Sequence, residues 1–408
     1  MISAWKWRVL RRLGEVGVTV ALFGIVAVLA ALGSVLAAPV IPDWAQERFG
    51  GSSVQTILEI LASSMLAVTT FSVSIMVTAF GSAASGATPR AIGLLQRDPT
   101  TQRVLAIFIG AFVYALVGII AMESGYYGPA GRVVLFAVSV AVVAVVIVAL
   151  IRWVQHLTRF GLLADTIGRV EAAALSALRA RSERPHLGGA PWVEPPVGAW
   201  PVCGPRTGHV QHVDLGALQG VAARGGFRLW VEADPGAFVH PGSVLARCDG
   251  LPGDAGTRRA LEAEIVGAFS IAHGRSYDQD PRFGLIALAE IAQRALSPAV
   301  NDPGTALDIL SRLARALADW RPAIPAAGGA EAPRFAAVHL RALAPEDLLR
   351  DAFDAVARDG AGVIEVMVRL QQVLAALAGI APGHFAGPAA VRAARAARLA
   401  EQALVLEE

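Results

Sequence analysis

The sequence predicts a membrane domain of four transmembrane helices followed by a cytoplasmic α+β region, in which a small β module precedes a helical domain. Two features of the composition predict this division. The chain of 408 residues is 55% hydrophobic and 17% charged, whereas an average soluble domain is about 25% charged. The deficit is uneven, because charged residues are rare between Gly14 and Arg90 and recur steadily after Arg159. The chain therefore divides into a membrane part and a water-soluble part.

Four apolar stretches are long enough to cross a bilayer, which takes about 20 residues for a hydrocarbon core of roughly 30 Å. We predict spans at residues 16–41, 54–80, 104–122 and 133–153. The first stretch is too long for the apolar core of a cleaved signal peptide, and three more follow it. We therefore assign residues 1–155 to a transmembrane domain, with the lipid bilayer as its partner.

Basic residues flanking the spans indicate the orientation, because cytoplasmic loops carry an excess of lysine and arginine. They gather before the first span, between the second and third spans, and after the fourth span: Lys6, Arg8, Arg11, Arg12, Arg90, Arg97, Arg103, Arg152 and Arg159. An even number of spans puts all three groups on one side. The pattern therefore predicts cytoplasmic N- and C-termini.

The second span differs from the others in carrying a polar stripe. At 100° per residue, its carboxylate and four of its hydroxyl groups fall on one face of the helix: Glu59, Ser63, Thr70, Ser74 and Thr78. Hydroxyl groups can replace water around an ion, so the stripe could line a polar path. The alternative is that small hydroxyl residues pack this helix closely against another.

Glu59 is the most informative member of this polar stripe. A carboxylate inside a span is costly and usually faces a partner or a watery cavity. This predicts a role at a pore mouth or in proton transfer. The alternative is that Glu59, about five residues from the start of its span, reaches the membrane interface.

The rest of the chain divides into three segments. We predict a connecting helix and a linker at residues 156–190. A small β module with several glycines follows at residues 199–250, and a helical domain at residues 257–408. The turn at residues 235–246 loosely resembles small barrel or hammerhead modules. It lacks the lysine that would carry biotin or lipoate, so we expect no cofactor.

Two predicted helices of the C-terminal domain begin with the same dipeptide. Asp280-Pro281 and Asp302-Pro303 each place a capping carboxylate before a proline at the first helical position. The alternative is that both aspartates converge with Asp278 and Asn301 on a divalent cation. The capping interpretation accounts for both aspartates, and we assign no metal site.

These dipeptides belong to longer motifs that resemble a known family. The motifs are Gln279-Asp280-Pro281-Arg282-Phe283-Gly284 and Ser297-Pro298-Ala299-Val300-Asn301-Asp302-Pro303. Together with the Ser/Thr-rich second span, they resemble bacterial predicted membrane proteins of the domain of unknown function 2254. The resemblance extends from the first span to about Trp320, with Gly304 in place of a bulkier residue. It implies a multi-pass protein of the bacterial inner membrane with a cytoplasmic C-terminal region, and it implies no activity.

The residues favour two function classes. We find no phosphate-binding glycine loop or evident catalytic set, so we expect no enzyme and assign no catalytic residue. No basic patch with interleaved aromatic residues indicates nucleic-acid binding. The first hypothesis is a self-associating ion channel or transport protein, with the second span turned inward and a cytoplasmic assembly or gating domain. The alternative is a membrane-anchored scaffold or sensor that binds an ion, small ligand or partner protein.

Overall fold

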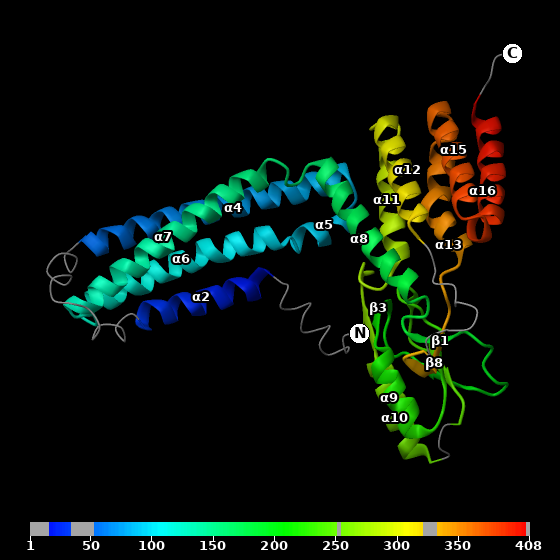
Figure 1. Cartoon of the computed structure of the whole chain (residues 1–408), viewed down its shortest axis with the longest axis horizontal. Helices are drawn as coiled ribbons and strands as arrows, with labels where there is room; N and C mark the ends of the chain where they lie inside the picture. Colours follow the sequence, from blue (N-terminus) through cyan, green and yellow to red (C-terminus); the bar gives the residue numbers. More distant parts are fainter. Residues whose placement is uncertain (1–15, 34–52, 251–253, 321–332, 405–408) are drawn as a thin grey trace. The chain divides into compact units, whose positions relative to one another are not determined.

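The computed structural model describes residues 16–33, 53–250, 254–320 and 333–404 (Figure 1). The chain forms two compact units that divide at about residue 166. We call the described residues up to 166 the membrane unit and those from 167 onward the C-terminal unit. The boundary falls near the beginning of α8 (Leu163–Glu183).

The membrane unit is entirely helical in its described residues. Its helices are α2 (Val16–Gly33), α4 (Ser53–Gly86), α5 (Pro89–Gln96), α6 (Pro99–Glu123) and α7 (Pro129–Leu157). Among the described residues, α4, α6 and α7 are long and apolar enough to cross a membrane. The shortest of these, α6, has 25 residues and is about 37 Å long at 1.5 Å per residue. These three predicted spans are therefore helices of sufficient length.

The predicted first span is described in part. Its helix α2 has 18 residues, all without charge, and packs along α6 in the same unit (Figure 1). Residues 34–41 of the predicted span lie outside the described residues, as do the basic residues before Val16. A fourth transmembrane span therefore stays a prediction.

Helix α6 is the central helix of the membrane unit. In the most apolar 18-residue stretch of α6, 56% of the residues are buried. The corresponding fraction is 17% in α4 and 22% in α7. It packs against α2, α4 and α7. The core around it includes Leu58 from α4, Phe108 from α6, and Leu135 and Trp153 from α7, all nearly inaccessible to solvent. Within this core, the Tyr114 hydroxyl group donates a hydrogen bond to the Leu135 carbonyl oxygen at 3.1 Å. This buried polar group therefore has a hydrogen-bond partner.

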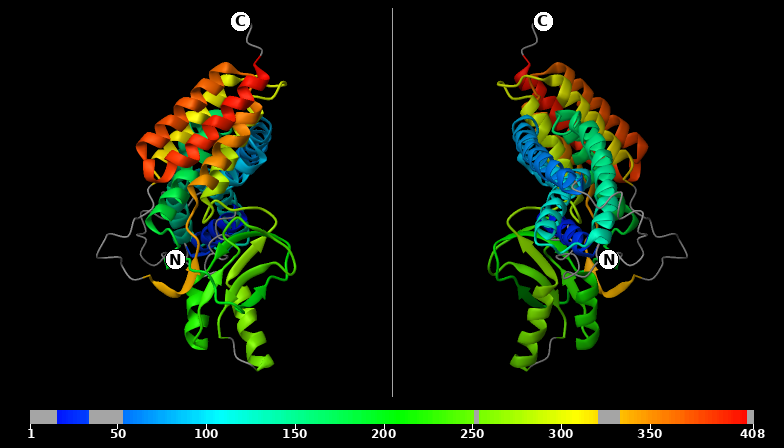
Figure 2. Two further views of the ribbon diagram at one scale, coloured as in Figure 1. Left: turned by 90° about the vertical axis from the view of Figure 1, so that its right-hand side faces the viewer. Right: turned by 90° about the vertical axis from the view of Figure 1, so that its left-hand side faces the viewer.

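The C-terminal unit combines two sheets with a group of helices. Beyond α8, its elements are β1 (Gly189–Pro191), β2 (Trp200–Cys203), β3 (Gly208–Val213), α9 (Leu215–Gly225), β4 (Leu229–Val231), β5 (Phe238–Val239), β6 (Val244–Cys248), α10 (Ala255–Gly267), β7 (Phe269–Ala272), α11 (Pro281–Ala295), α12 (Pro303–Ala318), β8 (Phe335–Leu340), α13 (Pro345–Leu349), η2 (Arg350–Asp354), α14 (Ala355–Asp359), α15 (Ile364–Ile380) and α16 (Pro382–Ala403). Figure 2 shows α11, α12, α15 and α16 side by side, apart from the sheets.

The sheets draw strands from well beyond the predicted β module. One sheet has the order β1-β8-β4-β6-β2, and the other has the order β5-β3-β7. Strands β1, β7 and β8 lie outside residues 199–250, and β8 is parallel to both β1 and β4. We predicted a helical domain from residue 257 onward, but α10 ends at Gly267 and Phe269–Ala272 pairs with β3 as a strand instead. Such pairing between distant segments leaves little local signal in a short strand.

The boundaries of the later helices depend on proline. Helix α11 begins at Pro281 and α12 at Pro303, as predicted. The last helix, α16, begins at Pro382 and includes Pro388 in its interior. Proline fits the first helical position, because an N–H group there has no acceptor within the helix and its absence loses no hydrogen bond. Pro382 occupies that position in α16.

Candidate functional site

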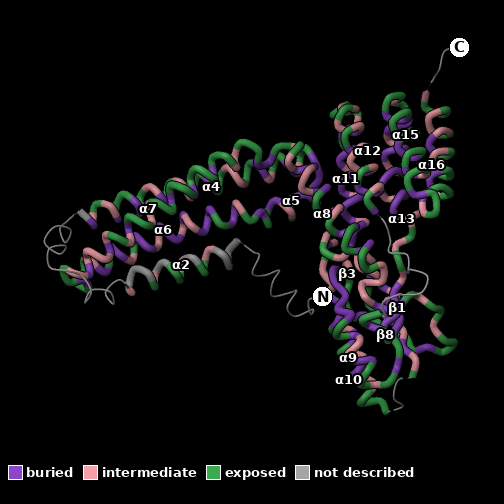
Figure 3. The backbone as a smooth tube through the Cα atoms, in the orientation of Figure 1, coloured by how far each residue is buried: buried purple, intermediate pink, exposed green. Residues whose placement is uncertain are grey.

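The polar stripe of the second span lies on the outer face of α4. Glu59, Ser63, Thr70, Ser74 and Thr78 are all exposed in the membrane unit. Figure 3 shows exposed positions recurring along α4, whereas α6 is more extensively buried. The face of α4 that packs within the subunit is the opposite one, and it carries Leu58, Leu61, Met65 and Ser72. The stripe therefore contributes nothing to the core of its own subunit.

Three of the four stripe hydroxyl groups donate to carbonyl oxygens of their own helix. Ser63 donates to the Glu59 carbonyl oxygen at 2.9 Å, Thr70 to Leu66 at 2.9 Å and Thr78 to Ser74 at 3.0 Å. Each of these hydroxyl protons is thereby satisfied, while the oxygen keeps lone pairs that can accept. The outer face of α4 therefore presents acceptor oxygens, and Glu59 adds a carboxylate that accepts from Gln55 at 3.0 Å.

A buried polar cluster joins the beginning of α6 to the end of α7. The carboxylate of Asp98 lies 3.1 Å from Nε2 of His156. It also accepts from the backbone N–H of Thr101 at 2.7 Å and from the Thr101 hydroxyl group at 2.8 Å. Trp153 stacks on the His156 ring, with centroids 5.8 Å apart. The cluster therefore fixes α6 against α7 at one end of the membrane unit.

Sequence reasoning missed this cluster. Asp98 precedes Pro99 and could have been recognised as a helix cap, as Asp280 and Asp302 were. Nothing local to His156 indicates that it meets a residue more than 50 positions earlier, because that contact arises from the antiparallel packing of α6 and α7.

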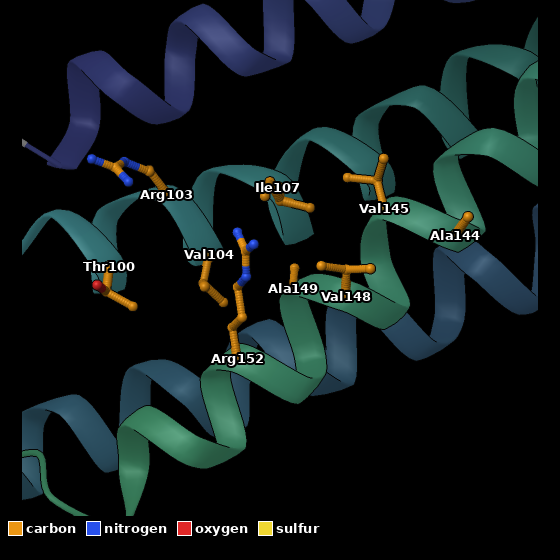
Figure 4. Close-up of a pocket in the computed structure, with 9 residues that line it drawn as sticks. All are labelled: Thr100, Arg103, Val104, Ile107, Ala144, Val145, Val148, Ala149 and Arg152. Carbon is orange, nitrogen blue, oxygen red and sulfur yellow. The ribbon is translucent and has the colours of Figure 1, made fainter.

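A groove runs between α6 and α7 at the same end of the membrane unit (Figure 4). It has a volume of about 410 Å³ and is lined by Thr100, Arg103, Val104, Ile107, Ala144, Val145, Val148, Ala149 and Arg152. Figure 4 shows the two arginines toward the Thr100 end, with Arg152 extending from α7 toward α6. The other six lining residues are apolar, and Thr100 adds a hydroxyl group at the charged end. The groove is therefore charged at one end and apolar along its length.

In the C-terminal unit, Asp280 forms a buried ion pair as well as a helix cap. Its side chain is 1% exposed and accepts from Nε and Nη2 of Arg275 at 2.7 and 2.9 Å. It also accepts from the backbone N–H of Phe283 at 3.2 Å, which confirms the predicted capping role. Burial raises the pKa of Asp280, and Arg275 opposes this shift. The carboxylate thus depends on the arginine for compensation.

The neighbouring residues complete this structural role. The Gln279 side chain accepts from the Val213 N–H at 2.9 Å and donates to the Val213 carbonyl oxygen at 3.3 Å, which ties the motif to β3. Gly236 lies against Asp280, where an added Cβ would lie 2.3 Å from a carboxylate oxygen. Its φ of +94° also favours glycine. This part of the motif therefore joins α11 to the sheet region.

The second motif forms the turn between α11 and α12. Ser297 and Pro298 begin the turn, and the Asn301 N–H donates to the Ser297 carbonyl oxygen at 2.9 Å. Asn301 has a φ of +49°, which asparagine tolerates better than most residues. Asp302 then caps α12 before Pro303, accepting from the Thr305 N–H at 3.0 Å and its hydroxyl group at 2.6 Å. The capping prediction is confirmed here too.

The alternative of a shared cation site finds no support in the structure. Asp278 accepts from the Ser276 hydroxyl group at 2.8 Å, whereas Asp280 pairs with Arg275 and Asp302 with Thr305. Across the described residues, no three His, Cys, Asp or Glu side chains are grouped as a metal ion would require. The aspartates of the two motifs therefore have separate structural partners.

A further buried arginine lies near Asp280 of the first motif. Arg181 of α8 is 4% exposed, and burial lowers its pKa to about 10 against the attraction of Asp234 and Asp280. Its Nη2 group donates to the Arg341 carbonyl oxygen at 2.9 Å. Burial likewise raises the pKa of Asp234, and Arg181 is the first of the cations that oppose this shift. The region is therefore a buried charge network built around arginine.

The fold and the exposed apolar helices define a helical membrane protein that carries a second, sheet-containing unit. The family described as "Predicted membrane protein (DUF2254)" matches residues 14–376. The chain belongs to this family. The match covers both units, in agreement with the resemblance found from the motifs.

Similar curated proteins occur in mycobacteria. The chain is 28% identical over 270 residues to an uncharacterized protein of Mycobacterium bovis, with the same identity to one of Mycobacterium tuberculosis. The alignment covers 63% of this chain and 50% of each relative, so the chain spans about half the length of the relatives it matches. No solved structure matches the chain.

Proposed function

We propose that this protein is a homo-oligomeric ion channel or transport protein of the bacterial inner membrane, with the polar stripe of α4 facing the other subunits. The proposal includes four spans and cytoplasmic N- and C-termini. One observation carries it: the five stripe residues lie on the face of α4 that is not packed within the subunit. In the oligomer, this face would line a polar path between subunits.

The unpacked face of α4 could meet lipid or a second copy of the chain. In a monomer, Glu59 and the stripe oxygens would border lipid, where polar groups are rare and usually face a protein interior or a watery cavity. Facing a second copy removes them from lipid. Hydroxyl and carboxylate oxygens along such a path can replace water around a cation. Self-association and conduction thus account for the same residues.

The distribution of arginines supports the proposed orientation. Arg90, Arg97, Arg103, Arg152 and Arg159 belong to the helix ends and turns that lie at one end of the membrane unit (Figure 1). Such an excess of basic residues is typical of the cytoplasmic side. The proposal places that end in the cytoplasm, together with the C-terminal unit as an assembly or gating domain.

Ion flux through reconstituted liposomes tests this function. We expect cation flux with the natural chain, and a change of several-fold in rate or selectivity with Glu59→Gln or Thr70→Val, because each removes an oxygen function from the path. The control is Ser72→Ala, which alters a hydroxyl residue on the packed face of the same helix and should leave flux unchanged. Absence of flux with the natural chain would contradict conduction and favour the membrane-anchored scaffold or sensor.

A further inference from the structure

The groove between α6 and α7 continues beyond its charged end. An adjoining groove of about 280 Å³ shares Ile107 and Val145 with it. Apart from Tyr114, its other lining residues are apolar or glycine, and they include Val26 of α2 and Val142 of α7. Together the two grooves form one apolar channel along the helices, which begins at Arg103 and Arg152. Volumes of this size are typical of small-molecule sites.

The charged end is available to an anion. Arg103 and Arg152 are both exposed, and in the described part of the chain neither guanidinium group forms an ion pair. This differs from Arg275, Arg282 and Arg312 of the C-terminal unit, which are each paired with carboxylates. Thr100 adds a hydroxyl group beside the arginines. Two guanidinium groups and a hydroxyl group are suited to the oxygen atoms of a phosphate.

The two ends together specify an amphiphile. We propose that this groove binds an anionic phospholipid, with its headgroup phosphate at Arg103 and Arg152 and one acyl chain along the apolar channel. A small phosphate compound would leave the apolar walls unused. A zwitterionic lipid also carries a phosphate, but the cation of its headgroup would be repelled by the two guanidinium groups. The arginines lie near the first residues of α6 and the last of α7, at the depth of a headgroup for helices that span a bilayer.

Native mass spectrometry of the full chain in mild detergent tests the proposal. We expect phosphatidylglycerol to bind about tenfold or more tightly than phosphatidylcholine, and Arg103→Gln/Arg152→Gln to abolish that preference. The matched control is Arg97→Gln/Arg159→Gln, which removes the same charge from exposed arginines at the same end that do not line the groove. Equal binding of both lipids by the natural chain, or equal loss in both double variants, would overturn the proposal.

A second variant tests the apolar channel while both arginines stay in place. Ala144 is exposed on α7, so Ala144→Phe should partly fill the groove and weaken phosphatidylglycerol binding several-fold. Glycerol 3-phosphate supplies the matching test of the headgroup alone, and we expect it to compete poorly. Competition as effective as that of the whole lipid, or full binding by Ala144→Phe, would refute the acyl-chain site.

Discussion

The buried pair of Arg275 and Asp280 shows at the residue scale how a recognisable motif serves the fold. The carboxylate is 1% exposed and the arginine side chain 20% exposed. Removing one partner of such a pair leaves a buried charge uncompensated, which costs about 3–5 kcal/mol. The aspartate is therefore more than a helix cap.

We predict that Arg275→Ala lowers the free energy of unfolding by about 3 kcal/mol, because it leaves the buried Asp280 carboxylate without its arginine partner. Denaturation of the full chain in detergent measures the change. The control is Arg224→Ala, which breaks the exposed pair with Glu264 and should cost less than about 1 kcal/mol. Equal costs would show that burial does not make the Arg275 pair important.

The Asp302 cap should make stability depend on pH. Hydrogen bonds from the Thr305 side chain and then its backbone lower the pKa of Asp302 from its ordinary value of 3.8. The ionised carboxylate therefore stabilises the fold above that value, and this contribution is lost as the pH falls through the lower pKa of the folded state.

Asp302→Asn tests this dependence, because asparagine can also cap a helix but does not ionise. We expect the natural chain to melt at a higher temperature than the variant at pH 7. The gap should narrow as the pH falls below 3.8, the ordinary value for aspartate. A gap that does not change with pH would show that the cap does not act through its charge.

At the scale of elements, the sequence predicts helices better than sheets. The lengths of α4, α6 and α7 follow from apolar runs, and the beginnings of α11 and α12 follow from Asp-Pro dipeptides. Strands β1, β7 and β8 were missed because pairing between distant segments decides them. Strand β8 pairs with strands more than 100 residues earlier, and β7 pairs with β3, which lies more than 50 residues earlier. The same reason hides the His156–Asp98 contact, whereas the α4 stripe could be read from helical periodicity alone.

Close helix packing in the C-terminal unit depends on Gly284 of α11. A Cβ at this position would lie 2.5 Å from the Cβ of Ala174 and 2.7 Å from its Cα, both in α8. We predict that Gly284→Ala lowers the free energy of unfolding by about 1–3 kcal/mol, because the two helices must separate. Chemical denaturation checks this value.

Gly379→Ala is the matched control, because it lies in helix α15 with no neighbouring atom within 4 Å of an added Cβ. It should raise stability by up to about 1 kcal/mol, as alanine favours the helix over glycine. If both substitutions stabilise the chain, the α8–α11 contact is not as close as described.

At the scale of the whole molecule, the proposed assembly and the proposed conduction both rest on the exposed stripe of α4. The outer face of α4 also carries large apolar side chains, including Leu66, Val73 and Val77, beside the stripe. A mixed face of this kind can contact lipid or another helix. Its polar side chains favour contact with another helix over contact with lipid. We propose that this face meets a second copy of the chain.

Disulfide cross-linking in native membranes tests that claim most directly. In a background with Cys203→Ser and Cys248→Ser, we predict that Thr70→Cys forms covalent dimers on mild oxidation, because the stripes of neighbouring subunits face each other. Ser72→Cys, on the packed face, should remain monomeric. Monomers with Thr70→Cys, or equal dimer formation with both, would contradict an interface at the α4 stripe.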